Sequence, residues 1–471
     1  MTRNAFLIAL VIVLMAVPLS ATRFVLEVSP SAAADLAAQY GLTILNQIPN
    51  SDVFLVTAPD TVDVSSLLSQ VSSDPNVLDF EVDNLAATPE ASSGTATWQT
   101  STSSSGSLSS GSLTNPGTSD GSDFSLDQST AGLLDSVSQA TVMGYYGALV
   151  PSYYVNQTAT SLINLGAAQD QFGALGAGVV AVIDTGVDPN HAALQGALLP
   201  GFDFTRHQNG ANEFQDLDQS TAGILDQSTA GILDMQTVVT LNQSTAGILD
   251  QSTAGILDTT TLPSDFGHGT MVAGIIHLVA PEAKILPLKA FTADGTGRIY
   301  DVVAAIHYAV NAGANVINMS FDYGQAKSAS LNAAIKFATS QGVICVASAG
   351  NMDSSNAVYP AANILAFGIA STTTDPVPDL QSSFTNYGSW VRMAAPGESI
   401  RTTYPGNHYA AATGTSFSAP FVSGTLALLY QYHGTLTPED ASAALQNAVW
   451  INSNLGWGRL DVYNAVATYA H

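Results

Sequence analysis

Continuous apolar runs alternate with helical patterns through the second half of the chain. Residues 179–183 form an apolar run typical of a strand buried on both faces of a parallel sheet. Four further strands are predicted at 285–288, 316–319, 343–347 and 366–370. Helical spacing fills gaps between them, at 270–278, 299–311 and 330–339. This alternation predicts an α/β fold with a doubly wound, mostly parallel sheet, whose functional residues lie at the carboxyl ends of strands.

A shorter pattern of strands and helices precedes this sheet. Strands are expected at 23–28, 43–45, 53–57 and 77–82, and helices at 31–40 and 64–71. Residues 22–85 are therefore predicted to form a separate small α/β domain.

The first 21 residues have the composition of a signal peptide. Arg3 is followed by an apolar run over 5–19 and then by Ser20-Ala21. Such a run is short for a membrane span and fits a signal-peptide core. We therefore expect a secreted or extracytoplasmic protein, with an uncleaved anchor as the alternative. The sequence has no second apolar stretch long enough to cross a bilayer, so no stable membrane insertion is expected after signal removal.

Residues 86–143 are predicted to be a linker between the small domain and a larger one at 144–471. Ser, Thr and Gly dominate most of this stretch, and such a composition cannot bury enough surface to order itself. We expect the two domains to be cut apart within it, at a bond that the sequence does not specify.

An eight-residue repeat interrupts the larger domain over 217–258. DQSTAGIL occurs at 218–225, 226–233 and 250–257, a copy that begins with Asn lies at 242–249, and a variant at 127–134 lies in the linker. Stacked repeats usually need three or more contiguous copies, and here only pairs are contiguous. Three interpretations stay open: an ordered insertion at the rim of a site, a segment that pairs with another copy, or low-complexity filler.

The composition excludes some partners. The 471 residues include 11 Lys plus Arg against 37 Asp plus Glu, a net charge of −26. Nucleic acid is therefore not expected as a partner, because phosphate binding needs a basic surface. Cys345 is the single cysteine, so no intrachain disulfide can form, and its apolar surroundings predict a buried strand residue.

Three short motifs carry the candidate chemistry. Asp184 follows the apolar run at 179–183, His268 stands between two glycines, and Ser416 lies among small residues at the start of an apolar helix. A serine hydroxyl needs a base to accept its proton, and an aspartate can hold that base in the right tautomer. The order Asp, His, Ser is one known order of such a triad. Each motif alone is also typical of an ordinary turn or helix cap.

Taken together, the motifs resemble those of the subtilisin-like serine proteases. The stretches are Ile183-Asp184-Thr185-Gly186, Gly267-His268-Gly269-Thr270 and Gly414-Thr415-Ser416-Phe417-Ser418-Ala419-Pro420, and the resemblance covers about residues 160–471. It implies peptide-bond hydrolysis through an acyl-enzyme. The order of elements in 22–85 resembles the inhibitory propeptide of these proteases, with an unrelated ferredoxin-like binding domain as the alternative.

The resemblance also implies the other residues of the site. Ala349-Gly350-Asn351 falls where the family keeps its oxyanion-hole asparagine. Gly295, Gly297 and the segment Ser320-Phe321-Asp322 fall where substrate pairs with strand edges. A Leu-Gly-Gly usually follows the serine at position 320, so Phe321 and Asp322 put the shape of the cleft in doubt. Asp322 could favour a basic substrate residue.

No cofactor is expected to be required. Many relatives carry a calcium loop after the helix of the catalytic histidine, whereas here Gly274 leads to Pro281-Glu282-Ala283 without an insertion. Ala193 stands where a ligand carboxylate is common. We therefore predict that this calcium site is missing.

Two functions of different classes follow. The first is a secreted serine endopeptidase that acts on polypeptides, is inhibited by its own propeptide and processes itself. The alternative is a catalytically silent binding or self-assembly protein that uses the repeats on a protease fold.

Overall fold

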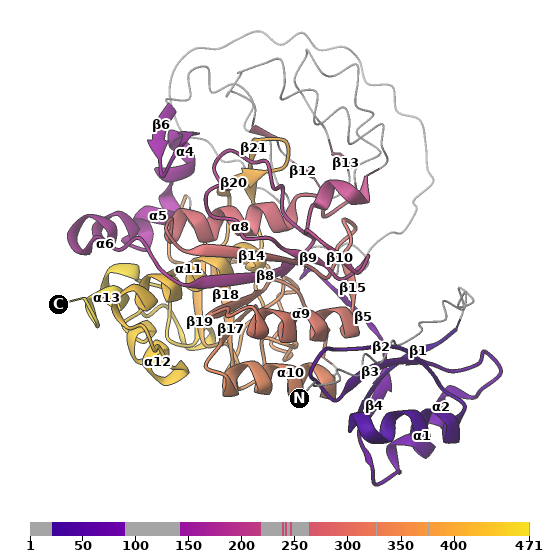
Figure 1. Cartoon of the computed structure of the whole chain (residues 1–471). Coiled ribbons are helices and arrows are strands. Elements are labelled where there is room, and N and C mark those ends of the chain that lie inside the picture. The colour runs from indigo at the N-terminus through magenta and orange to yellow at the C-terminus, as the bar shows by residue number, and fades with distance from the viewer. Residues whose placement is uncertain are drawn as a thin grey trace, which may run out of the picture. The chain divides into compact units, whose positions relative to one another are not determined.

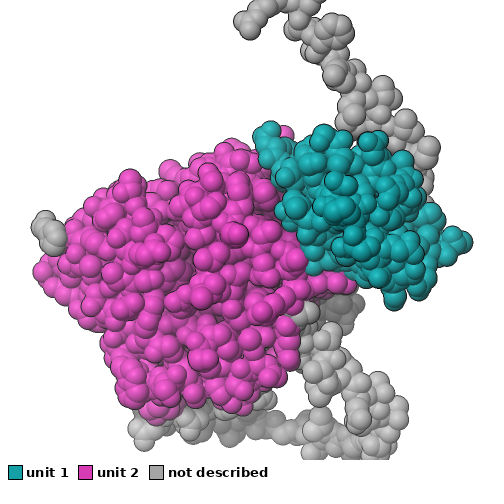
Figure 2. Space-filling view, turned by 90° about the horizontal axis from the view of Figure 1, so that it is seen from below, with its two compact units in different colours: residues 1–83 teal, residues 84–471 magenta. Residues whose placement is uncertain are grey.

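A computed structural model describes residues 21–89, 142–217, 238–239, 241–242, 245–246, 263–325, 327–374 and 376–470. It divides into two compact units, Met1–Asp83 and Asn84–His471 (Figure 2). The predicted signal peptide, except Ala21, and most of the predicted linker and of the repeat insertion lie outside the described residues.

The first unit is an antiparallel sheet with two helices. Its elements are β1 (Arg23–Val28), α1 (Pro30–Tyr40), β2 (Thr43–Gln47), β3 (Val53–Thr57), α2 (Val64–Ser72) and β4 (Val77–Val82). The strand order is β2-β3-β1-β4, with every pairing antiparallel. Pro30 opens α1, and Gly41 ends it in the left-handed conformation that glycine adopts most easily. The strands and helices predicted for 23–82 are confirmed to within two residues at each end.

The second unit contains an eight-stranded sheet in the order β10-β9-β14-β8-β16-β17-β18-β19. The central strands are β8 (Val179–Asp184), β14 (Lys284–Lys289), β16 (Val316–Met319), β17 (Ile344–Ser348) and β18 (Ala366–Thr372). The edges are β9 (Phe202–Asp203), β10 (Gln208–Asn209) and β19 (Met393–Pro396). All neighbours are parallel except β10, which is antiparallel to β9. The predicted α/β fold is confirmed, and Cys345 is a buried residue of β17.

Helices cover both faces of this sheet. α8 (His268–Val279) packs against α11 (Thr415–Tyr432), and α9 (Ile299–Asn311) packs against α10 (Ala329–Ser340). Figure 1 shows α8 and α9 on opposite sides of β8 and β14. Every residue of α8 and all of α11 through Tyr430 are buried, which matches their nearly continuous apolar sequences.

Shorter elements complete the second unit. A hairpin of β6 (Val142–Tyr145) and β7 (Ala148–Pro151) leads to α4 (Ser152–Val155), α5 (Thr158–Leu162) and α6 (Leu165–Phe172). β20 (Ile400–Tyr404) pairs with β21 (His408–Ala412), and β11 (Val238–Val239) is parallel to β21. β12 (Leu241–Asn242) pairs with β13 (Thr245–Ala246), and the chain ends with α12 (Pro438–Leu445), η2 (Ser453–Leu455) and α13 (Val462–Ala467). Of the helices in the described ranges, none is long and apolar enough to cross a membrane.

Candidate active site

Asp184 and His268 meet where β8 ends and α8 begins. The His268 Nδ1–H donates to Asp184 Oδ1 at 2.7 Å, and both side chains are buried. The Thr185 N–H donates to the same carboxylate oxygen at 2.7 Å, which fixes its orientation. Because Nδ1 is held against the carboxylate, Nε2 is turned away from it and can act as a base elsewhere.

A glycine allows this close approach of helix and strand. A Cβ on Gly269 would lie 2.0 Å from the Gly186 carbonyl oxygen and 3.1 Å from Asp184 Oδ1. Any larger residue would push α8 away from the end of β8. The helix starts at His268, two residues before the position expected from the sequence.

Ser416 is the second residue of α11, at the positive end of a long buried helix. Pro420 lies inside this helix and has no N–H to donate to the carbonyl four residues earlier, which is that of Ser416. Ser320 supplies the missing hydrogen bond, because its Oγ donates to the Ser416 carbonyl at 3.0 Å. The ring of Phe417 lies 5.4 Å from that of His268, centroid to centroid, so the N-termini of α8 and α11 come together.

Asn351 follows β17 and is anchored to the residue before Ser416. Its Oδ1 accepts the N–H and the hydroxyl of Thr415, each at 2.9 Å. With the oxygen fixed in this way, the Nδ2 donor lies on the opposite side of the amide. Asn386 reinforces the loop, because its Nδ2 donates to the Ala349 carbonyl at 2.9 Å. Sequence reasoning missed Asn386, which no nearby pattern marks.

The predicted cleft edges pair with a described strand of the same unit. β5 (Leu85–Ala87) runs antiparallel to β15 (Thr296–Arg298), with Ala86 opposite Gly297. On the other edge, Ala87 and Asp322 exchange both main-chain hydrogen bonds, at 3.0 and 2.8 Å. The Thr88 N–H donates to the Gly295 carbonyl at 2.9 Å. An extended chain therefore lies between the two edges, as a peptide substrate would.

The unusual side chains at 321 and 322 do not interrupt this pairing. Phe321 is fully buried, and its ring lies 5.0 Å from that of Phe291. Asp322 accepts the Gly324 N–H at 3.0 Å, while its main chain pairs with Ala87. Ser320 is buried, and its hydroxyl donates to the Ser416 carbonyl, so its side chain holds the backbone of Ser416 in place.

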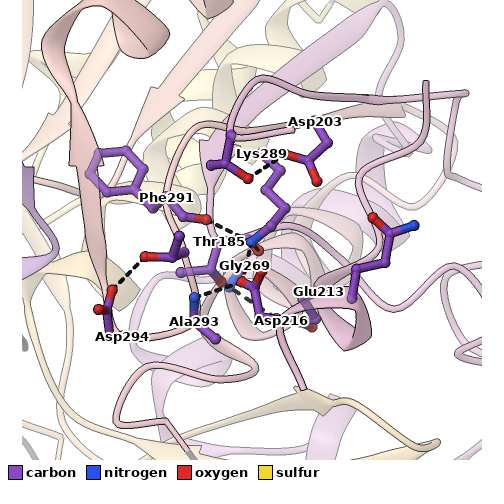
Figure 3. Close-up of polar contacts among 12 residues, drawn as sticks. Thr185, Asp203, Glu213, Asp216, Gly269, Lys289, Phe291, Ala293 and Asp294 are labelled. Atoms are coloured by element: carbon purple, nitrogen blue, oxygen red, sulfur yellow. Dashed lines mark hydrogen bonds and ion pairs between the residues drawn. The ribbon is translucent and has the colours of Figure 1, made fainter. Parts of the chain in front are cut away.

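A buried lysine, which Figure 3 labels as Lys289, lies in the strand next to that of Asp184. Lys289, which pairs with Asp184 in the β14–β8 register, is completely buried. Its Nζ donates to the Thr185 and Phe291 carbonyls at 2.6 and 2.7 Å and to Asp216 Oδ2 at 2.6 Å. Sequence reasoning missed this cluster. The available signal was a lysine that ends an apolar strand next to the strand of Asp184.

The stretch between α8 and β14 is where the calcium loop is predicted to be missing. α8 ends at Val279 and β14 begins at Lys284, so no loop of ligands lies between them, and Ala193 is buried. Among the described His, Cys, Asp and Glu residues, no group of three or more could hold a metal ion. The expectation that this calcium site is missing stays a prediction.

Comparison with known proteins gives matches over most of the second unit. A model of the Subtilase family matches residues 176–459. Thermitase of Thermoactinomyces vulgaris is 32% identical over 291 residues, which cover 61% of this chain and 88% of that protein. The thermophilic serine proteinase of Bacillus sp. (strain AK1) is 33% identical over 292 residues, and the match covers 61% of each chain.

A solved structure shares the fold. Fervidolysin from Fervidobacterium pennivorans, described as a keratinolytic enzyme related to subtilisin, matches with a TM-score of 0.66 and 17% identity. The match covers 95% of this chain and 61% of that one, and at this identity it shows a common fold alone.

Proposed function

The chain belongs to the subtilase family, and from this premise we propose that it is a secreted serine endopeptidase made as a self-processed precursor. Asp184, His268 and Ser416 are the triad of this proposal, and polypeptides are its substrates. The observation that carries it is the 2.7 Å contact between His268 and Asp184, at a point where the N-termini of α8 and α11 meet.

The proposed reaction proceeds through an acyl-enzyme. The Ser416 hydroxyl attacks the carbonyl carbon of the scissile bond while His268 Nε2 takes its proton, and Asp184 stabilises the imidazolium. His268 then returns the proton to the leaving amine as the C–N bond breaks. A water molecule that loses a proton to His268 then attacks the acyl group, and His268 gives that proton to the Ser416 oxygen as the ester bond breaks. Every proton has a donor and an acceptor among these side chains, so we propose no cofactor.

The negative oxygen of the tetrahedral intermediate needs donors that are already in place. We assign this role to Asn351 Nδ2 and to the Ser416 N–H at the start of α11. The two hydrogen bonds from Thr415 to Asn351 Oδ1 support this assignment, because they hold the amide in one orientation.

The strand β5 supports inhibition by the N-terminal domain and self-processing. It pairs with both cleft edges, so no other peptide could occupy this part of the cleft at the same time. Ser320 precedes Asp322 by two residues and donates to Ser416. Because the pairing is antiparallel, the chain after Ala87 leads towards Ser320 and Ser416. We therefore propose that the precursor is cut among the residues that follow Thr88.

Expression of wild type beside Ser416→Ala tests the function. Wild type is expected to cut itself after Thr88, as intact mass and N-terminal sequencing would show, and to be labelled covalently by a fluorophosphonate. Ser416→Ala is expected to show neither. Ser423→Ala is the matched control, since Ser423 is a buried serine of the same helix that donates to Asn318 Oδ1 at 2.8 Å. Labelling that survives in Ser416→Ala, or a wild type that is never labelled, would contradict the proposal and favour a silent binding protein.

Secretion is tested separately. Fractionation of expressing cells should place the processed protein outside the membrane. Recovery in the membrane fraction with residues 1–21 still attached would indicate an uncleaved anchor instead.

A further inference from the structure

Glu213 is a fully buried carboxylate between the segment that follows Asp184 and the first turn of the His268 helix. It begins the short 3-10 helix η1 (Glu213–Asp216), and it accepts the Gly267 N–H on Oε2 at 2.9 Å. The Thr185 hydroxyl donates to the same oxygen at 3.4 Å, and the Thr270 hydroxyl donates to Oε1. Thr185 directly follows Asp184, whereas Gly267 and Thr270 flank His268.

We propose that Glu213 is a positioning residue, which connects the segment after Asp184 to the first turn of the His268 helix and so sets the geometry of the Asp184–His268 pair. It contacts neither member of the pair. Its three donors come from the two segments that must stay together for the 2.7 Å contact to persist. The proposal rests on the proposed function, since it assigns a role in that reaction.

The backbone that carries Glu213 is itself held in place. Asp216, at the other end of η1, accepts from Lys289 Nζ at 2.6 Å and from the Ala293 N–H at 2.7 Å (Figure 3). Arg206 Nη2 lies 2.5 Å from the other oxygen of Asp216. Since Lys289 also donates to the Thr185 carbonyl, a continuous set of hydrogen bonds joins β14, η1, the end of β8 and α8. A small movement of Glu213 would therefore change both catalytic segments together.

The two carboxylates of η1 have different partners. Asp216 is paired with two cations, whereas none of the ion pairs among the described residues includes Glu213. A carboxylate without a cation in contact is costly to bury, and donors from a hydroxyl and an amide offset only part of that cost. If this position only filled space, an apolar side chain would be less costly to bury. The three donors from the catalytic segments therefore favour a positioning role.

The charge of Glu213 depends on its neighbours from several elements. Burial has the largest effect on the carboxyl and raises its pKa, and the nearby charges of Asp188 and Asp184 raise it further. The Thr270 hydroxyl and Lys289 lower the pKa, and the net value is about 8. The titratable and charged groups that act on it are Asp184 on β8, Asp188 after β8, Lys289 on β14 and Tyr404 on β20. The ionised form can accept all three hydrogen bonds, whereas protonation turns one acceptor oxygen into a donor. All three hydrogen bonds from Thr185, Gly267 and Thr270 to Glu213 are therefore present only above about pH 8.

The test compares Glu213→Gln with wild type across pH. The amide has the same shape but keeps one acceptor oxygen and never ionises. We expect kcat/KM of the variant to fall about tenfold at pH 9, because a misplacement of about 1 Å costs up to about 100-fold and this one should be smaller. At pH 6 it should stay within about twofold of wild type. The step near pH 8 in the wild-type profile should vanish, while the step that reports His268 persists.

Asp461→Asn is the matched control for the loss of a buried carboxylate. Asp461 is buried and accepts from the Asn464 N–H and from Asn164 Nδ2, each at 2.9 Å, at the start of α13. This variant should change the melting temperature and leave the pH profile of kcat/KM as it is in wild type. A profile of Glu213→Gln that also matches wild type would overturn the proposal.

A second readout does not need activity. In full-length Ser416→Ala, the proton between His268 Nδ1 and Asp184 should give a low-field NMR signal that shifts near pH 8, and addition of Glu213→Gln should remove that shift. If wild type is inactive and this signal still responds, the protease function fails and the positioning role stands. If wild type is active and the signal is unchanged by the substitution, the positioning role fails alone.

Stability gives an independent check that the variant folds. The folded-state pKa of Glu213 lies above the ordinary value of 4.5, so its contribution to stability is full below about pH 4.5 and is lost as pH rises through 8. The melting temperature of wild type should therefore fall relative to Glu213→Gln between pH 5 and pH 9. A constant difference between the two proteins would show that Glu213 does not titrate in this range.

Discussion

The catalytic centre and the substrate cleft are held together in different ways. Around Asp184, His268 and Asn351, buried side chains form the hydrogen bonds, and each donor has a particular acceptor. Along the cleft, β15 and Asp322 use their main chains to hold β5. Side chains in the first region specify geometry, whereas those in the second can change without loss of the pairing.

This difference predicts a gradient of mutational effects. A substitution in the catalytic centre leaves a buried group without its partner, which costs the full desolvation of that group. A substitution along the cleft leaves the main-chain hydrogen bonds intact and changes only what the side chain recognises.

The largest effect is expected for Lys289→Met. Removal of the lysine leaves Asp216 buried beside Arg206 alone, and loss of one partner of a buried ion pair typically costs about 3–5 kcal/mol of unfolding free energy. Urea titration would measure this loss of unfolding free energy, in the Ser416→Ala background so that self-digestion is avoided. Arg206→Met is the control, because Arg206 is partly exposed and an exposed pair contributes about 0–1 kcal/mol. Equal losses in the two variants would contradict a special role for the buried cation.

Sequence patterns predicted most of the fold because each strand of a buried parallel sheet has its own short apolar pattern in the sequence. Residues 179–183 are apolar throughout, and only a strand covered on both faces needs such a run. The start of α8 was predicted two residues late, since helix ends depend on tertiary contacts such as that of Gly269 with Gly186. The start of α11 was predicted to within one residue, although Pro420 lies inside the helix and leaves the Ser416 carbonyl to accept from Ser320 instead.

The supporting residues of the site could not be predicted in the same way. Glu213 and Gly267 are separated by 54 positions, and Lys289 and Asp216 by 73. No local period connects such pairs, and only the folded sheet brings them together. The family motifs marked Asp184, His268, Ser416 and Asn351, whereas the groups that hold these residues carry no motif.

A smaller loss is expected for Asn351→Ala, and it should appear in turnover. The substitution removes one proposed donor to the oxyanion, which typically lowers kcat about 10²–10³-fold, a range measured in subtilisin, with little change in KM. Steady-state kinetics on a peptide ester would measure both constants. Asn386→Ala is the matched control, since Asn386 donates to the Ala349 carbonyl in the same loop and lies one step further from the reaction. A larger effect at 386 than at 351 would show that loop order, and not the Asn351 donor, limits turnover.

The smallest effect is expected for Asp322→Asn, and it tests the cleft side of the comparison. The amide keeps an oxygen that can accept the Gly324 N–H, and the main-chain pairing at this position does not involve the side chain. Overall kcat/KM on a neutral peptide should therefore stay within about twofold. Preference for Lys or Arg over Gln near the scissile bond should fall by up to about fivefold, which corresponds to the roughly 1 kcal/mol of an ion pair that water can reach once β5 has left the cleft.

A peptide library that varies one position at a time would measure that preference at low and high salt. Added salt should weaken the preference of wild type, because screening reduces the attraction between the substrate cation and Asp322 in the open cleft. Asp294→Asn is the control, since Asp294 is an exposed acid beside Gly295 on the opposite edge and accepts the Thr296 N–H at 3.0 Å. A wild type that treats Lys, Arg and Gln alike would remove the charge preference of Asp322 and leave main-chain pairing as the sole recognition at this edge. A loss of activity on neutral peptides as large as that of Asn351→Ala would instead show that the cleft depends on side chains as strictly as the catalytic centre does.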